Sequence, residues 1–452
     1  MIAVLRRLAR RAPWLVRAAV SVIRGVIGAA TFLEAPLFLL RHRRLFRNPL
    51  GYVFWVWSFG HNIFELDYVA RLYYPHRISL ISMPDPRANT YFSYCFERNV
   101  DTVVFRSVLD PLLERLERRL VLFPVRRAQY RVMRGWLLLV SAVHRRFTAI
   151  DQHATIARTL SLVPEEGMWI GRESTGDLVP TDDLTGYIRL LRDGIGRPPR
   201  MPAGLRRQCE DGIRRRHPTF FDRPFVTLLL RQKGRNSEDF SDSVRVAGPP
   251  KNYLPAVRHL TAHGYNVVGS GETAHEVFES VPGYYALRDV DVPPKLLNLY
   301  LLLHCAMYIG QASGPNWMGS TVGYPTLVCD GVWYSGTCRE TDLILYKPYY
   351  EAQTGRRLSI VEVFREHADL VFGYNFARKG IRVGANSDDE ILEGVKETLA
   401  AMEGRLVLSD DDRRLCEAYL ALLPPRAIIA SQRNRPPLYV LRQYEKELLE
   451  TV

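Results

Sequence analysis

The stretch IGQASGPNWMGSTVGYPTLVCDG, residues 309–331, joins two apolar runs through a turn of small residues. The runs AMYIG at 306–310 and PTLVCDG at 325–331 are short, apolar and bounded by glycine or proline, as buried strands are. Between them, residues 313–323 open on Ser-Gly-Pro, which predicts a tight turn that leads into a short helix. Strand, helix and strand in this order predict one unit of a parallel sheet.

The same alternation of strand and helix extends from this stretch in both directions. In the second half of the chain it predicts strands at 224–230 and 265–271, helices at 251–264 and 292–305, and mostly helix from about residue 390. In the first half it predicts a strand at 52–60, a helix at 61–75 and a strand at 77–83, followed by less legible apolar runs at 101–106 and 119–124 and a helix-like stretch at 128–148. The aspartates at 182–183 and 410–412 resemble helix starts.

These elements predict an α/β protein with two Rossmann-like domains in series that face a cleft. Residues 163–205 are rich in Gly, Pro and charge, which is typical of a linker or domain edge. The expected organisation is an arm at 1–48, a first Rossmann-like domain at 49–200, a second at 201–395 and C-terminal helices at 396–452.

The positive charge is concentrated at one end of the chain. The formal net charge is +13, and residues 1–48 hold ten arginines and one acid, Glu34, so the other 404 residues carry only +4. The body has no helix-turn-helix repeat, RNP motif or zinc knuckle, and we therefore do not expect a nucleic-acid partner. The six cysteines are scattered without CxxC or metal-ligand spacing, which favours reduced thiols in a reducing compartment.

The N-terminal arm has the pattern of a helix that lies in a bilayer surface. Arg10, Arg17, Ser21 and Arg24 are spaced to form one polar stripe. The opposite face is apolar, with Leu15, Val16, Ala19, Val22, Ile23 and Val26. Charges interrupt the run too often for a membrane span, so residues 1–45 predict an interfacial helix that binds an anionic membrane surface. A signal peptide and a helix packed on the protein's own core are the alternatives.

The turn after residue 310 has features of an anion site. Ser313 and Gly314 let the backbone approach a ligand closely, Pro315 suits the first turn of a helix, and the N–H groups that follow are free to face an anion. A sugar-nucleotide diphosphate is the obvious candidate, although such turns also occur as plain strand-to-helix connections. We assign Asn316, Gly319 and Ser320 to the same donor-binding segment.

Three segments together resemble the bacterial GT-B glycosyltransferases related to heptosyltransferases. ASGPNWMGSTVGYPTLVCDG is similar to the family's Asp-Ser/Thr-Gly-Pro-x-His turn, helix and Gly-x-Pro-Thr strand. SFGHNIFELDYVARLYYPHRISLI and KNYLPAVRHLTAHGYNVVGSGETAHE resemble the family's first strand-helix unit and its lysine-containing helix entry. RQKGRN is similar to the strand end of a group of uncharacterised bacterial glycosyltransferases. The resemblance covers roughly residues 52–83 and 224–331.

The resemblance implies a set of site residues, with departures. The family's Asp before Ser-Gly-Pro is Ala312 here, its His is Trp317, and its Gly-Asp base is Gly60-His61. We therefore expect His61 to serve as the base, because a pKa near 6.5 suits proton transfer at neutral pH, with Glu65 and Asp67 as alternatives. For donor binding we expect Arg231, Lys233 and Lys251 at the phosphates and Glu272 or Glu276 at the ribose. No metal or other cofactor is expected, since no convincing DxD motif is present.

The expected function is transfer of a sugar from a nucleotide-sugar donor to a glycan or lipid-linked glycan in bacterial surface polysaccharide or glycoconjugate synthesis. With the membrane-binding arm and the reduced cysteines, we expect a peripheral protein on the cytoplasmic face of the bacterial inner membrane. Two other classes stay open: a catalytically silent sugar- or lipid-binding relative, which the loss of Asp at Ala312 supports, and a sugar-nucleotide epimerase, which would share the cleft but need no membrane arm.

Overall fold

The computed structural model describes most of the chain. The described residues are 13–54, 59–83, 91–111, 123–144, 147–150, 185–231, 246–271, 273–311, 313–332, 339, 341–366, 373–423 and 434–450. The chain divides into two compact units. Unit 1 comprises Met1–Arg158 and Ile195–Pro199, and unit 2 comprises Thr159–Gly194 and Arg200–Val452.

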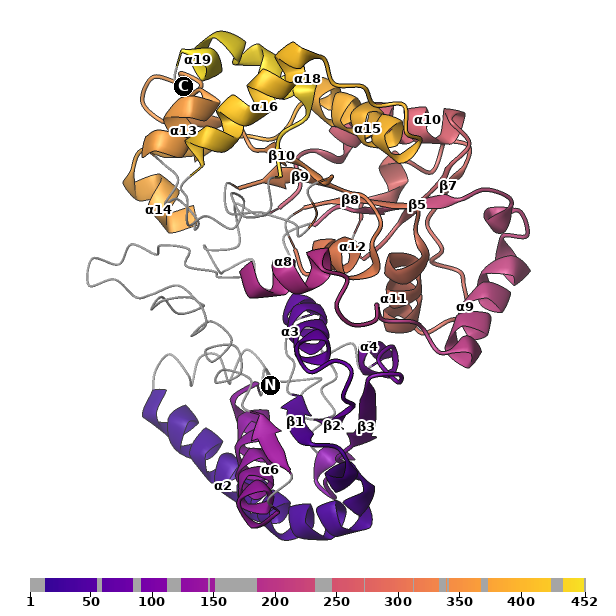
Figure 1. Cartoon of the computed structure of the whole chain (residues 1–452), viewed down its shortest axis with the longest axis vertical. Helices are drawn as coiled ribbons and strands as arrows, with labels where there is room; N and C mark the ends of the chain where they lie inside the picture. Colours follow the sequence, from indigo (N-terminus) through magenta and orange to yellow (C-terminus); the bar gives the residue numbers. More distant parts are fainter. Residues whose placement is uncertain are drawn as a thin grey trace. The chain divides into compact units, whose positions relative to one another are not determined.

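Unit 1 is built around a parallel sheet in the order β3-β2-β1-β4 (Figure 1). Its strands are β1 Leu50–Phe54, β2 Ile78–Ser82, β3 Val100–Val104 and β4 Thr148–Ile150. Its helices are α2 Pro13–Arg41, the 3-10 turn η1 Arg43–Arg47, α3 Phe59–Leu72, α4 Tyr91–Tyr94 and α6 Phe123–Val143. Strand β2 is buried along its whole length, as expected for the interior of a parallel sheet.

The second half of α2 packs into the core of unit 1. Ala35 and Leu39 are buried in one cluster with Val53 of β1, Ile81 of β2 and Met133 of α6. Of the polar stripe expected on this helix, Ser21 is exposed and Arg24 is partly exposed, while Arg10 and the side chain of Arg17 lie outside the described residues. Ala35, Leu39 and Leu45 thus belong to the core of unit 1, so this part of the chain is not separated from the unit at residue 48.

A buried ion pair closes unit 1 around a distant segment. In α3, Asp67 accepts a hydrogen bond from Arg71 Nε at 2.6 Å, and both side chains are almost fully buried. Arg71 also donates to the carbonyl of Ile195 at 2.8 Å. A Cβ at Gly196 would lie 2.7 Å from Arg71 Cγ, and its φ of +86° is a conformation that glycine adopts readily. Asp67 therefore holds Arg71, and through it residues 195–199, inside unit 1.

Unit 2 is built around a parallel sheet in the order β10-β9-β8-β5-β6-β7. Its strands are β5 Phe225–Leu229, β6 Asn266–Gly269, β7 Tyr284–Tyr285, β8 Met307–Gly310, β9 Thr326–Gly331 and β10 Leu343–Tyr346; β11 Tyr349–Glu351 and β12 Ile381–Val383 pair antiparallel. Its α-helices are α8 Thr185–Arg192, α9 Ala203–Arg216, α10 Leu254–Ala262, α11 Pro294–His304, α12 Asn316–Val322, α13 Ile360–Glu366, α14 Gly373–Arg378, α15 Asp388–Met402, α16 Asp410–Leu422, α18 Leu438–Gln443 and α19 Glu445–Leu449. The 3-10 turns are η2 Phe220–Asp222, η4 Pro250–Tyr253 and η5 His275–Val277.

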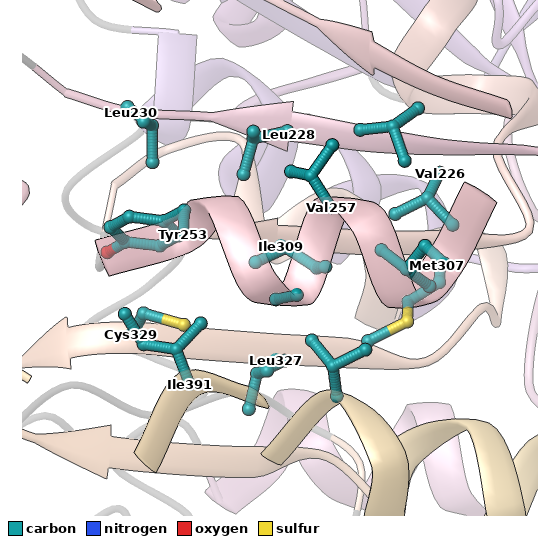
Figure 2. Close-up of a cluster of buried hydrophobic side chains, with 14 of the residues drawn as sticks. Val226, Leu228, Leu230, Tyr253, Val257, Met307, Ile309, Leu327, Cys329 and Ile391 are labelled. Carbon is teal, nitrogen blue, oxygen red and sulfur yellow. The ribbon is translucent and has the colours of Figure 1, made fainter. Parts of the chain in front are cut away.

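One face of this sheet packs on α10 and α15. Alternate side chains of β5, β8 and β9 point toward these helices, as the period of two requires. Figure 2 shows them in one cluster with Tyr253, Val257 and Ile391: Val226, Leu228, Leu230, Met307, Ile309, Leu327 and Cys329. On the other face, the hydroxyl of Thr227 donates to the carbonyl of Leu301 in α11 at 3.0 Å. The central strands of unit 2 are thus covered by helices on both faces. The ends of the strands, rather than the faces of the sheet, are therefore where a ligand could reach it.

Most of the predicted elements are confirmed, with shifted ends. The strand expected at 52–60 is corrected to β1, which ends at Phe54, and α3 already begins at Phe59. The run at 119–124 falls mostly outside the described residues, and its last two residues begin α6. Within the expected linker, residues 185–192 form α8, whose Tyr187 hydroxyl lies 3.1 Å from Thr321 Oγ1 of α12. The helix start at 410–412 is confirmed by a capping box between Ser409 and Asp412, whereas residues 182–183 lie outside the described residues.

Replacing Asp67 with Ala should destabilise the protein by about 3–5 kcal/mol, because it leaves the buried Arg71 without its partner. Denaturant unfolding followed by far-UV circular dichroism measures this loss. The matched control is Asp211→Ala, which removes an exposed helical carboxylate 4.0 Å from Arg214 and should cost well under about 1 kcal/mol. Equal stability of the two variants would contradict a structural role for the Asp67–Arg71 pair.

Candidate functional site

The strand order of unit 2 points to one edge of its sheet. From the central strand β5, the chain first extends the sheet on one side through β6 and β7, and then returns to build β8, β9 and β10 on the other side. The order therefore reverses between β5 and β8, which are hydrogen-bonded neighbours. In open parallel sheets, ligands bind outside the carboxyl ends of the strands at this reversal. The candidate site comprises the residues that follow Leu229 and Gly310.

Arg231 and Gln311 meet at this reversal. The backbone N–H of Arg231 donates to Gln311 Oε1 at 2.6 Å, and the carbonyl of Arg231 accepts from Ala247 N–H at 2.8 Å. Gln311 is fully buried and in turn donates to the Tyr253 hydroxyl at 2.9 Å. The backbone at Arg231 is thus fixed on both sides, while its side chain is only partly buried.

Asp330, at the end of β9, is the centre of the polar network beneath this edge. Its Oδ2 accepts from Gly248 N–H at 2.7 Å and from the Tyr253 hydroxyl at 2.6 Å. Its Oδ1 accepts from Asn386 N–H at 2.9 Å and from Lys347 Nζ at 3.4 Å. The carboxylate is fully buried, and these four donors stabilise its charge there.

Burial keeps Tyr253 in its protonated form. Burial, together with the neighbouring Asp330 carboxylate, raises the pKa of Tyr253 well above its ordinary value, so the phenol stays protonated and donates. Asp330 itself has a φ of +51°, a left-handed conformation that Asp tolerates better than most residues do. The network therefore links four segments of unit 2 through one buried carboxylate, and we assign its members a positioning role.

The turn after β8 forms a second part of the candidate site. Asn316 N–H donates to the carbonyl of Ser313 at 3.1 Å, and Trp317 N–H donates to the carbonyl of Gly314 at 3.3 Å. Pro315 directly precedes α12, and Ser313, Gly314 and Pro315 are all partly exposed. The predicted turn and short helix are confirmed. Because α12 has only seven residues, its dipole contributes less to an anion than a long helix would.

The three expected donor residues in α12, Asn316, Gly319 and Ser320, are all buried. A Cβ at Gly319 would overlap Thr326 Oγ1 of β9, so this glycine lets the helix approach the strand closely. Ser320 is 5% exposed. Their placement supports a packing role, and the part of this segment open to a ligand is the turn at 313–315.

A pocket of about 520 Å³ lies beside the carboxyl end of β6 and the first turns of α11. Apolar side chains such as Leu287, Val292 and Leu297 line it, together with the polar side chains of Glu276, Arg288 and Asn298. Asn298 Oδ1 accepts from Ser270 Oγ at 3.2 Å. A pocket with apolar walls and a few polar groups is the usual form of a small-molecule site, and this one is large enough for a nucleoside.

His275 forms part of the wall of this pocket. Its Nδ1 lies 2.8 Å from the Tyr284 hydroxyl, and the ring packs over Gly269, where a Cβ would come within 2.5 Å of it. Burial, and to a smaller extent Arg288, lowers the pKa of His275. The imidazole is therefore neutral at pH 7.

The other predicted residues have mixed outcomes. Lys251 is exposed on η4, at the entrance to α10, and Glu276 is exposed on the rim of the pocket, 3.8 Å from Arg288. Lys233, Glu272 and Ala312 lie outside the described residues. His61 and Glu65 belong to α3 by backbone, but the described side chains of that helix begin at Leu66. The expectation of Asp67 as an alternative base is corrected, because its carboxylate is buried and paired with Arg71.

A second cavity, of about 650 Å³, lies at the opposite edge of the sheet. Its lining includes Arg223 before β5, Asn266 at the start of β6 and Gly283 before β7. These are the amino ends of the parallel strands, where open sheets do not place their ligands. Although this cavity is larger than the pocket beside β6, its position makes it the weaker candidate for the ligand site.

Sequence reasoning missed Gln311, Asp330, Tyr253 and His275. Gln311 and Asp330 each occupy the carboxyl end of a predicted strand, which is a signal that could have been used. Tyr253 and His275 carry no comparable signal, because their roles depend on partners in other elements. Among the residues that the structure describes, no group of three or more His, Cys, Asp or Glu side chains could hold a metal ion.

Comparison with known proteins adds a likeness of fold. No family model matches the sequence, and no curated protein matches it. A family 9 glycosyl transferase from Veillonella parvula is similar over 62% of this chain and 79% of its own, with 11% identity and a TM-score of 0.35. The E. coli ADP-heptose lipopolysaccharide heptosyltransferase II is similar over 62% and 83%, with 12% identity and a TM-score of 0.32. The UDP-GlcNAc 2-epimerase from Neisseria meningitidis, bound to UDP-GlcNAc, is similar over 89% and 98%, with 11% identity and a TM-score of 0.30.

The structure itself defines an α/β protein with two units, each built on a parallel sheet. Unit 1 also contains the long N-terminal helix α2. The solved structures named above include glycosyltransferases and an epimerase, and at these identities and TM-scores the likeness carries no argument about substrate or reaction.

Replacing Asp330 with Asn should destabilise the protein by about 2–5 kcal/mol. Both carboxylate oxygens accept hydrogen bonds only, so either orientation of the amide would set its NH₂ group against donors such as Gly248 N–H or Asn386 N–H. The control is Asp388→Asn, an exposed residue in the first turn of α15, which should cost less than about 1 kcal/mol. Denaturant unfolding of both variants is the measurement, and wild-type stability of the Asp330 variant would remove the network from its structural role.

The stability of the protein should fall as the pH decreases below about 6.5, the ordinary pKa of histidine. Because the folded state lowers the pKa of His275, the unfolded state binds a proton at a higher pH than the folded state does. His275→Gln should reduce the pH dependence of the unfolding free energy, without removing it, since burial also lowers the pKa of His304. Unfolding measured at pH 7.5 and 5.5 tests this, with the exposed His76→Gln as control. An unchanged slope in His275→Gln would be the contrary result.

Proposed function

We propose that this protein is a glycosyltransferase that uses a nucleotide-sugar donor. The observation that supports the proposal most is the position of two features at the strand-order reversal of a parallel sheet: the partly exposed Arg231 follows β5, and the Ser313-Gly314-Pro315 turn follows the neighbouring β8. A diphosphate needs positive charge and close backbone approach, and this edge offers both. The sequence resemblance to the heptosyltransferase-related group is consistent with this assignment.

The donor is proposed to lie along the carboxyl edge of the unit 2 sheet. The diphosphate is placed at Arg231 and the turn at 313–315, with Lys251 as an additional cation at the rim. The nucleoside is placed in the pocket beside β6, where Glu276 would accept hydrogen bonds from the ribose hydroxyls. Because α12 is short, we assign most of the charge neutralisation of the leaving group to the Arg231 guanidinium.

The proposed reaction is direct transfer of the sugar to an acceptor hydroxyl. A base removes the hydroxyl proton, the acceptor oxygen forms a bond to the anomeric carbon, and the bond between that carbon and the diphosphate oxygen breaks with its electron pair going to the nucleoside diphosphate. His61 is the proposed base and Glu65 the alternative, since Asp67 is engaged by Arg71. Leaving-group charge is carried by Arg231, without a metal ion.

The acceptor is proposed to be a glycan or a lipid-linked glycan of the bacterial cell envelope, met at the cytoplasmic face of the inner membrane. The N-terminal helix supports this location. By length and composition its segment Ala18–Arg41 is long and apolar enough to cross a membrane, and only 22% of its most apolar window is buried within the protein. We propose that the helix holds the protein at the membrane surface as a peripheral protein rather than crossing it.

Arg231→Ala should weaken binding of nucleoside diphosphates by about 10- to 100-fold while the protein stays folded, because the lost interactions are charge-assisted hydrogen bonds. Isothermal titration with ADP and UDP measures the affinity. Arg223→Ala is the matched control: Arg223 is exposed two residues before β5, at the other end of the same strand, and its removal should leave affinity unchanged. Equal losses in both variants, or none in either, would contradict the placement of the diphosphate.

Incubation with a panel of nucleotide sugars distinguishes the reaction classes. Acceptor-dependent release of a nucleoside diphosphate supports a glycosyltransferase. Interconversion of the donor sugar at C2 would indicate an epimerase instead, and binding without turnover for any donor and acceptor would indicate a catalytically silent protein.

A further inference from the structure

The outer face of α2 is uncharged over most of the helix. Between positions 18 and 40, every exposed residue is Ala, Gly, Ser, Val, Phe or Leu. Leu33, Leu37 and Leu40 are 71%, 70% and 69% exposed. From Val22 to Leu40 this face extends roughly 27 Å at 1.5 Å per residue. Scattered exposed apolar residues are ordinary, but a continuous apolar face of this length marks an interaction surface.

Helix α6 lies beside α2 and runs in the same direction. Gly28 of α2 faces Val132 of α6, and four residues further along both helices the Trp136 Nε1–H donates to the carbonyl of Phe32 at 3.2 Å. The rings of Phe32 and Trp136 are 5.2 Å apart. A step of four residues toward the C-terminus of α2 thus matches a step of four residues toward the C-terminus of α6, so the two helices are parallel.

The exposed apolar residues of α6 continue this contact line. Val132 and Trp136 are followed at intervals of three and four residues by Leu139 and Val143, which places all four along one side of the helix. Leu139 and Val143 are exposed. In the register of these two contacts, Leu139 and Val143 lie level with the buried Ala35 and Leu39, within two residues of the exposed Leu37 and Leu40 along α2. The last turns of both helices therefore carry exposed apolar side chains at similar heights.

Basic residues border this surface at one end. Directly after Leu40 come Arg41, Arg43, Arg44 and Arg47, all of them exposed. Each arginine near an anionic bilayer contributes through attraction to lipid headgroups. An apolar face that adjoins a group of arginines matches the acyl region and the anionic headgroups of a membrane.

We propose that α2 and the C-terminal half of α6 form one composite platform that docks into a single leaflet of an anionic membrane. The platform is defined by Val22, Val26, Phe32, Leu33, Leu37, Leu40, Leu139 and Val143, with Arg41, Arg43, Arg44 and Arg47 at the headgroups. The inference rests on the membrane location proposed above, but not on sugar transfer. It adds α6 as a membrane-binding element, whereas the sequence indicated residues 1–45 alone.

The packing of α2 explains why the helix lies in one leaflet. Its inner face is fixed to the sheet of unit 1 through Ala35 and Leu39, and Glu34 accepts a hydrogen bond from Val108 N–H at 3.2 Å. Its neighbour α6 carries Arg131 and Arg134 in the half that precedes Gly135. If α2 crossed the bilayer, these groups would have to enter the hydrocarbon or lose their contacts, and both are costly.

The test measures binding of the full-length protein to vesicles of phosphatidylglycerol and phosphatidylcholine. The double variant Leu33→Glu/Leu37→Glu, and separately Leu139→Glu, should each reduce the partition coefficient by about tenfold or more, because a charge replaces an inserted leucine. Val407→Glu is the control: Val407 is 84% exposed in unit 2, and its variant should bind as wild type does. Arg43→Gln/Arg44→Gln/Arg47→Gln should weaken the dependence on salt and on anionic lipid.

Folding of each variant is checked by its Tm, since every substituted side chain is exposed and should leave the core intact. Unchanged vesicle binding by the folded Leu33/Leu37 variant overturns the platform, and unchanged binding by Leu139→Glu overturns the part assigned to α6. If the wild-type protein does not bind vesicles but sediments as a dimer, and these variants sediment as monomers, the surface binds a second copy of the chain instead. Retention in the membrane after alkaline extraction would indicate a span. Nucleoside-diphosphate binding by the same variants is a separate readout, so the platform and the proposed transferase function can fail independently.

Discussion

The buried carboxylate of Asp330 ties together most of the segments that form the candidate site. Its donors are Gly248 before η4, Tyr253 in η4, Lys347 after β10 and Asn386 just before α15. Through Tyr253 and Gln311 the same network reaches the backbone of Arg231. An anionic group in the core is stable only with its donors in place, so the geometry at the carboxyl ends of β5, β8 and β9 depends on this one side chain.

The sequence predicts the strands of unit 2 well because a strand buried on both faces must be a short apolar run, as in PFVTLLL and PTLVCDG. It predicts the turn at 313–315 because Ser-Gly-Pro restricts the backbone locally. It could not predict that Asp67 pairs with Arg71, since a carboxylate in a helix near a glycine turn resembles a catalytic group equally well. It could not find the role of Asp330 either, because the four donors come from distant parts of the chain.

The N-terminal helix illustrates how tertiary packing divides one helix between two environments. Its composition allows an interfacial helix, a core helix and a membrane span, and periodicity alone does not decide among them. In the structure Ala35 and Leu39 join the core while Leu33 and Leu37 stay exposed, so only one face of the helix is covered by unit 1.

The most direct test of the account is hydrogen–deuterium exchange of the full-length protein with and without a saturating nucleoside diphosphate. The account predicts added protection at the carboxyl edge of the unit 2 sheet, in peptides that cover 246–254, 269–276 and 313–320. Peptides that cover the opposite cavity, at 219–223 and 280–285, should be unchanged. Protection confined to that opposite cavity, or no protection anywhere in unit 2 despite measurable binding, would contradict the assignment of the donor site.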